Sequence, residues 1–134
     1  MAKVEEIEGV GPVYAEKLSQ AGVVTTADLL EKGATPEGRQ TLVQKTGISD
    51  KLILRWVNHA DLFRIKGIRT QYAELLEAAG VDSVRELAQR NAANLAQALA
   101  DVNKEKKLVR RVPVESQIED WIKGAKDLPR AIQY

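Results

Sequence analysis

Apolar residues recur along this chain at helical spacing, and short polar or glycine-containing stretches divide them into segments. Residues three and four positions apart lie on one face of an α-helix, so each stripe predicts a helix with one buried face. The two longest stripes are Ile53, Trp56, Val57, Ala60 and Phe63, and Val114, Ile118, Trp121, Ile122 and Ala125. Helices of this length are not stable alone, because helix nucleation is unfavourable, and the pattern therefore predicts an all-α bundle.

Capping and helix-breaking residues predict where these helices begin and end. Ser, Thr and Asn side chains accept hydrogen bonds from a helix's first turn, Pro fits that turn, and Gly commonly follows the last one. In chain order, the predicted boundaries are Pro12 and Gly22, Thr25 or Thr26, Thr35-Pro36 and Gly47, Ser49, Ser83-Val84-Arg85-Glu86, Asn91 and Pro113.

One segment of the chain returns in altered form. Residues 7–18, Ile-Glu-Gly-Val-Gly-Pro-Val-Tyr-Ala-Glu-Lys-Leu, match residues 65–76 at an offset of 58, and Ala21-Gly22-Val23 matches Ala79-Gly80-Val81. The repeat predicts an internal duplication into two tandem five-helix units, residues 1–63 and 64–134. Trp56 and Trp121 come late in each half, within apolar stripes, and are predicted to be buried.

The repeated segment begins with a glycine-rich reversal. Gly9 and Gly11 are expected to supply the positive φ or close backbone approach that the turn requires, so a bulky residue at position 11 should distort it. The N–H groups of Val10 and Gly11 are predicted to point outward at the positive end of a helix, which makes an anion site. The alternative is that the glycines only let two helices pack closely.

These residues resemble a known motif. Residues 7–30 are similar to the helix-hairpin-helix motif, by which many DNA repair, recombination and replication proteins hold a phosphate backbone. Together with residues 34–39, 46–49 and 110–113, the chain resembles an uncharacterised bacterial family of tandem helix-hairpin-helix proteins, catalogued as a domain of unknown function. The resemblance implies the fold, contact with DNA phosphates and almost no further activity. It also implies two hairpins in each half, at residues 9–11 with 47–49 and 67–69 with 112–114.

The charge pattern limits this implication. The chain carries 20 Lys or Arg and 19 Asp or Glu, a net charge of +1, whereas a nucleic-acid binder usually has a clear basic excess. Three glutamates crowd the first hairpin; Arg64, Lys66 and Arg69 surround the second, which has lost its second glycine. One hairpin is thus expected to keep the geometry and the other the charge. The candidate phosphate-binding residues are Gly9, Val10, Gly11, Lys17, Lys66, Gly67, Arg69, Lys106, Lys107, Arg110 and Arg111.

The sequence offers few residues that could serve in catalysis. The sequence contains one histidine, His59, and no cysteine, and it shows neither metal-ligand spacing nor a Gly-x-Ser-x-Gly elbow. DNA glycosylases with similar hairpins need a downstream aspartate, and Asp28 is the only acid near that distance. Such enzymes also need a second helical domain to form a pocket for the flipped base. We therefore predict a non-catalytic protein without a metal or cofactor.

Two functions remain open. The protein is either a weak, sequence-independent binder of double-stranded DNA or a scaffold for a protein partner with no affinity for nucleic acid. The sequence shows no signal-peptide core and no run of membrane-spanning length, so we expect a cytoplasmic protein with no membrane partner.

Overall fold

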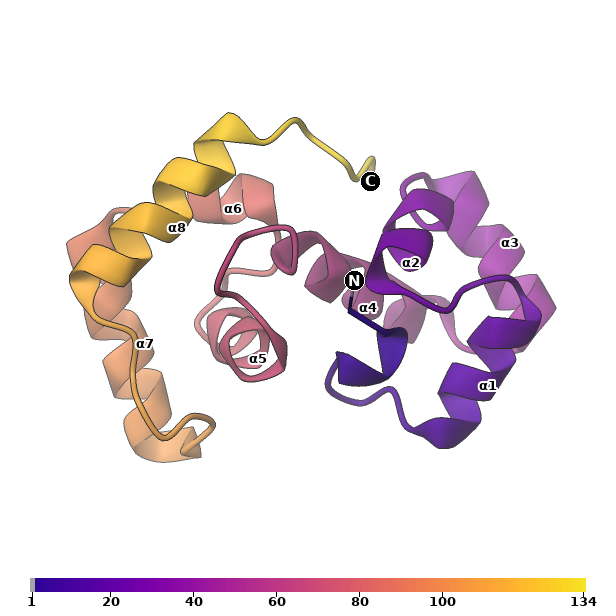
Figure 1. Ribbon diagram of the computed structural model, residues 1–134, viewed down its shortest axis with the longest axis horizontal. Helices are drawn as coiled ribbons and strands as arrows, with labels where there is room; N and C mark the ends of the chain where they lie inside the picture. Colours follow the sequence, from indigo (N-terminus) through magenta and orange to yellow (C-terminus); the bar gives the residue numbers. More distant parts are fainter. Residues whose placement is uncertain (1) are drawn as a thin grey trace. The chain divides into compact units, whose positions relative to one another are not determined.

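The computed structural model describes residues 2–134, which form eight α-helices and a short 3-10 turn (Figure 1). The elements are η1 (Val4–Glu6), α1 (Pro12–Gln20), α2 (Thr26–Lys32), α3 (Pro36–Thr46), α4 (Asp50–Leu62), α5 (Thr70–Ala78), α6 (Val84–Ala88), α7 (Ala92–Lys106) and α8 (Glu115–Asp127). Within this range the only strand-like pairing is one isolated bridge between Lys3 and Thr25. The all-α prediction is confirmed.

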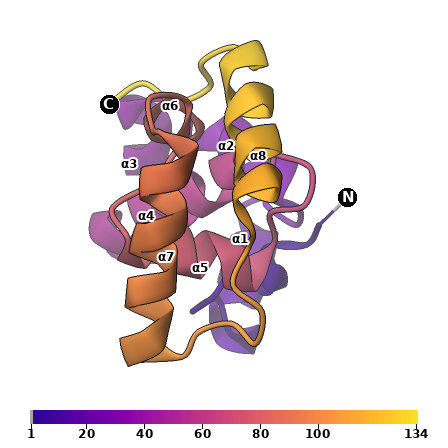
Figure 2. The same ribbon diagram turned by 90° about the vertical axis from the view of Figure 1, so that its left-hand side faces the viewer.

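The helices gather into two compact units. The first unit consists of Met1–Asp61 with Ala131–Tyr134, and the second unit of Leu62–Arg130. In the first unit α3 packs against α1 and α2; in the second, α7 packs against α5, and α8 against α6 and α7. Figures 1 and 2 both show α7 and α8 side by side. The second unit contains four α-helices and the last residue of α4, rather than five complete helices.

Local capping explains the helix starts. The hydroxyls of Thr35 and Ser83 accept hydrogen bonds from the N–H groups three residues later, at 3.0 and 3.2 Å, and the side-chain oxygen of Asn91 does the same at 3.0 Å. Thr25 caps α2 in the same way, at 3.0 Å. The predicted starts of α2, α3, α6 and α7 are confirmed, because each cap depends only on residues within one turn.

Two helices present matching buried faces. Helices α4 and α8 each contain 13 residues, and both bury their fourth, seventh, eighth and eleventh residues. These are Ile53, Trp56, Val57 and Ala60 in α4, and Ile118, Trp121, Ile122 and Ala125 in α8. Val114 does not belong to this face, contrary to the prediction. It is the N-cap residue, with extended backbone, and it is 60% exposed.

Each of these helices carries a tryptophan that contacts the first helix of its own unit. The rings of Tyr14 and Trp56 have centroids 5.2 Å apart and planes tilted by 60°. Tyr72 and Trp121 repeat the arrangement at 5.2 Å and 58°. Tilted aromatic pairs of this kind are favourable beyond the area that they bury. The predicted burial of both tryptophans is confirmed, at 0% and 3% exposure.

The last residues of the chain pack against the first unit. The buried guanidinium of Arg39 donates to the carbonyl of Gly33 at 2.8 Å and to that of Gln133 at 2.9 Å. The Tyr134 hydroxyl donates to Asn58 Oδ1 at 2.6 Å. A buried guanidinium needs acceptors to offset its desolvation, so Arg39 ties the chain end to the start of α3.

Candidate nucleic-acid interface

The first hairpin, residues 9–11, and the second hairpin, residues 67–69, have similar backbone conformations. Gly9 and Gly67 both have φ +94, a backbone conformation that residues with a side chain rarely adopt. Each turn closes with a hydrogen bond of 3.1 Å, from Val10 N–H to the carbonyl of Ile7 and from Ile68 N–H to that of Ile65. The amide of Val10 is therefore used inside the turn, and the prediction that it points outward unpaired is wrong.

The second glycine of the motif is not required by the turn. Gly11 has φ −82 and ψ −179, and its counterpart Arg69 has φ −129 and ψ −163, both extended conformations open to any residue. A Cβ atom at Gly11 would meet no atom within 4 Å. The expectation that a larger residue there distorts the hairpin is wrong. The prediction that one hairpin keeps the geometry and the other keeps the charge is also wrong, because the second hairpin has both.

Each hairpin leads directly into a helix of nine residues. Gly11 precedes α1 and Arg69 precedes α5, and neither N-cap residue makes a side-chain hydrogen bond to the first turn. The first N–H groups of a helix lack intrahelical acceptors and lie at the positive end of its dipole. Both helix starts can therefore accept an anion, and the surrounding charges decide between them.

Acidic side chains surround the first hairpin. Glu5 and Glu8 are exposed, and a hollow of about 220 Å³ beside α1 is lined by Glu5 and Glu16. Lys17 is exposed but lies in the last turn of α1, away from the helix start. Carboxylates within a Debye length of about 8 Å oppose the approach of phosphate.

The second hairpin is basic. Lys66 and Arg69 are exposed, and the guanidinium carbon of Arg69 lies 5.8 Å from the ring centroid of Phe63, within range of a cation–π interaction. Arg64 donates to the carbonyl of Pro129 at 2.8 Å. Two cations are thus presented beside the start of α5, while a third is held against the chain that follows α8.

The basic cluster runs from the last turn of α7 into the loop before α8, and it consists of Lys104, Lys106, Lys107, Arg110 and Arg111. Asn103 holds this loop by two hydrogen bonds with the backbone of Val109, at 2.9 and 3.0 Å. The hydroxyl of Tyr72, in the first turn of α5, donates to the carbonyl of Arg111 at 3.1 Å. The structure therefore brings Arg111 to the helix that starts at the second hairpin. Lys106, Lys107, Arg110 and Arg111 are all exposed.

The two units differ in net charge. The first unit contains seven Lys or Arg and nine Asp or Glu, for a net charge of −2. The second contains thirteen and ten, for a net charge of +3. Of the candidate residues, Gly9, Val10, Gly11 and Lys17 lie in the first unit and all others lie in the second.

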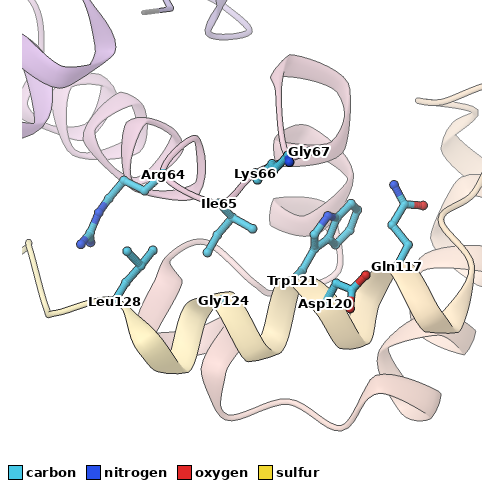
Figure 3. A pocket seen from close by; sticks show the side chains of 9 residues that line it. All are labelled: Arg64, Ile65, Lys66, Gly67, Gln117, Asp120, Trp121, Gly124 and Leu128. Atoms are coloured by element: carbon cyan, nitrogen blue, oxygen red, sulfur yellow. The ribbon is translucent and has the colours of Figure 1, made fainter.

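A groove of about 550 Å³ lies between the second hairpin and α8 (Figure 3). Its lining residues are Arg64, Ile65, Lys66, Gly67, Gln117, Asp120, Trp121, Gly124 and Leu128. Sequence reasoning missed Gln117 and Asp120 as site residues, because their position opposite the hairpin follows from how α8 packs. An alignment of the α8 sequence with the α4 sequence could have identified both residues.

Asp28, the candidate for a catalytic carboxylate, caps α2. Its carboxylate accepts hydrogen bonds from the N–H groups of Thr25 at 3.1 Å and Val24 at 3.2 Å. These two bonds, that of Thr25 first, hold the pKa of the Asp28 carboxyl below its ordinary value of 3.8. A lowered pKa marks a carboxylate that stabilises the fold in its charged form.

The Asp28 contribution to stability should therefore depend on pH. It is fully present above the ordinary pKa and is lost as pH falls through the lowered, folded-state pKa. Asp28→Asn should lower the urea midpoint at about pH 7. At about pH 2.5, the difference in midpoint between the variant and the parent protein should be smaller. A constant difference at both pH values would contradict this role.

The other residues that could take part in catalysis or metal binding form no metal-binding cluster among residues 2–134. His59 is fully buried in α4. Among residues 2–134 no group of three or more His, Cys, Asp or Glu could hold a metal ion. Within the same residues, no helix is long and apolar enough to cross a membrane.

Comparison with known proteins identifies a family. The chain belongs to the family described as Domain of unknown function (DUF4332), which it matches over residues 8–128. No curated protein and no solved structure matches the chain. The family description carries no activity, so any function has to be argued from the site itself.

Proposed function

We propose that this chain is a non-catalytic tandem helix-hairpin-helix protein that binds the phosphate backbone of double-stranded DNA without reading its sequence. The observation that carries the proposal is the second hairpin. There a glycine turn with φ +94, a helix start without a side-chain cap and the exposed cations Lys66 and Arg69 coincide.

The matching elements of the units support an internal duplication. Helices α1 and α5 have nine residues each and begin 58 positions apart; α4 and α8 have 13 residues each and begin 65 positions apart. The second unit is longer mainly in α7 and in the loop that follows it. This added length carries most of the basic cluster, whereas the corresponding connection of the first unit, residues 47–49, contains no charged residue.

The distribution of charge supports a contact through the second unit. Its net charge of +3 attracts phosphate, whereas the net charge of −2 on the first unit and the glutamates at its hairpin repel it. Backbone contacts from Lys, Arg and helix N-termini position a duplex but carry no sequence information. With few cations, the affinity should be in the range of about 10⁻⁴ to 10⁻⁶ M typical of non-specific binding.

The test is a fluorescence-anisotropy titration with two unrelated labelled duplexes. Both should bind alike at about 50 mM salt, and the affinity should fall with increasing salt with a log–log slope near −0.9 per phosphate neutralised. If the anisotropy stays flat to high micromolar protein at low salt, the DNA proposal fails and the scaffold for a protein partner becomes the better explanation. A strong preference for one duplex would also contradict backbone binding.

A further inference from the structure

Two residues of α8 that line the groove are much smaller than their counterparts in α4. Arg55 is the sixth residue of α4 and His59 the tenth; the same positions of α8 hold Asp120 and Gly124. The loss of an imidazole and of most of an arginine leaves space beside Trp121.

In the first unit, the chain fills the corresponding space itself. The guanidinium Nη1 of Arg55 lies 3.7 Å from the position that a Cβ atom on Gly9 would take, and Trp56 Nε1 lies 3.6 Å from it. Trp56 and His59 are both fully buried. An arginine side chain therefore covers the glycine turn and its tryptophan in this unit.

Gly124 has no packing reason to be glycine. A Cβ atom there would meet only Ile65 Cδ1, at an ordinary contact distance of 3.9 Å. Glycine inside a helix is destabilising relative to alanine. A glycine at position 124 leaves open space along α8, next to the second hairpin.

The groove offers hydrogen-bonding groups without partners. Trp121 is 3% exposed, and its indole Nε1 lies 3.2 Å from the Cβ position of Gly67. Its N–H, like that of Trp56 in the first unit, donates to no acceptor in the described chain. Asp120 is exposed on the same helix and forms no ion pair among residues 2–134. Figure 3 shows Asp120 and Gln117 at the Trp121 end of the groove, with Lys66 on the hairpin side.

We propose that this groove binds an extended peptide segment through one arginine side chain. The guanidinium pairs with Asp120, where a charge-assisted and bidentate contact is possible, and the aliphatic stem lies against Ile65 and Trp121. The peptide backbone supplies carbonyl oxygens to the Trp121 N–H and to Lys66. Arg55 in the first unit is the precedent for this occupant. The proposal does not depend on DNA binding.

Indole N–H signals in an NMR titration provide a direct test, because the chain has only two tryptophans. The probe is a capped Gly-Ser peptide with one central arginine, added to about 10 mM, the range in which a millimolar Kd is measurable. The Trp121 signal should shift saturably, while that of Trp56, which is fully buried, should stay in place. Trp121→Phe assigns the two signals.

Variants and control peptides decide the outcome. Asp120→Asn should weaken binding about tenfold or more, because a hydrogen bond to a charged group is lost. Gly124→Ala should raise the melting temperature and weaken binding at the same time. The proposal is overturned if the Trp121 signal does not move, or if Asp120→Asn binds equally well. It is also overturned if inorganic phosphate or a central-glutamate peptide shifts the signal as strongly as arginine.

Discussion

Gly38→Ala is expected to destabilise the first unit severely. Gly38 lies in the first turn of α3, and a Cβ atom there would overlap the backbone carbonyl oxygen of Lys32, at the end of α2. Backbone cannot move aside as a flexible side chain can, and Thr35 Oγ1, which caps α3, would also lie 3.2 Å away. The expected loss is about 3 kcal/mol or more of the free energy of unfolding, a large share of a domain's total stability.

Urea denaturation followed by circular dichroism measures this loss. Gly11→Ser is the matched control, because the site is open, the backbone is extended and serine is a favoured N-cap residue. Its urea midpoint should equal or slightly exceed that of the parent protein. Equal midpoints for Gly38→Ala and the parent would show that α2 and α3 do not approach as closely as described.

Giving either hairpin the residues of the other is expected to change DNA binding in opposite directions. Glu8 and Gly11 occupy the places in the first hairpin that Lys66 and Arg69 occupy in the second, at the offset of 58. The double variant Lys66→Glu with Arg69→Gly should weaken duplex binding by about tenfold or more. It should also make the log–log salt slope shallower by about 1.8, which corresponds to two phosphates.

The reciprocal variant, Glu8→Lys with Gly11→Arg, should strengthen binding and steepen the slope by a similar amount. The variant of the first hairpin should keep the parent's urea midpoint, because its side chains are exposed or open to solvent and the backbone at position 11 is extended. The variant of the second hairpin should lower the midpoint only slightly, because Arg69→Gly removes the contact with Phe63. If both variants titrate like the parent protein, the hairpins do not contact the DNA.

Helix starts and buried stripes were predictable because they depend on neighbours within a few residues. The caps at Thr25, Thr35 and Asn91 and the burial of Trp56 and Trp121 follow from spacing alone. Helical spacing predicts a buried Val114 because the pattern extends one turn too far when the helix start is unknown. The structure places it at the exposed N-cap.

The backbone of the hairpins could be predicted only in part. Two glycines in one turn suggested that both were required, but only the first has a positive φ in each hairpin. The outward amide of Val10 was wrong for a related reason, since the turn closes on that N–H group. Residue type limits the accessible φ and ψ values, but the path of the chain decides which of them is used.

Residue types and their spacing predict an all-helical chain, most helix boundaries, a repeated glycine turn and the residues that carry charge. The folded chain shows which distant residues meet: Arg39 with Gln133, Tyr72 with Arg111, and the second hairpin with α8. Local hydrogen bonds and helical spacing depend on residues that are close together in the sequence. Contacts between distant segments depend on how whole helices pack, and side-chain size and charge at single positions, such as Asp120 and Gly124, then decide whether a space is filled or open.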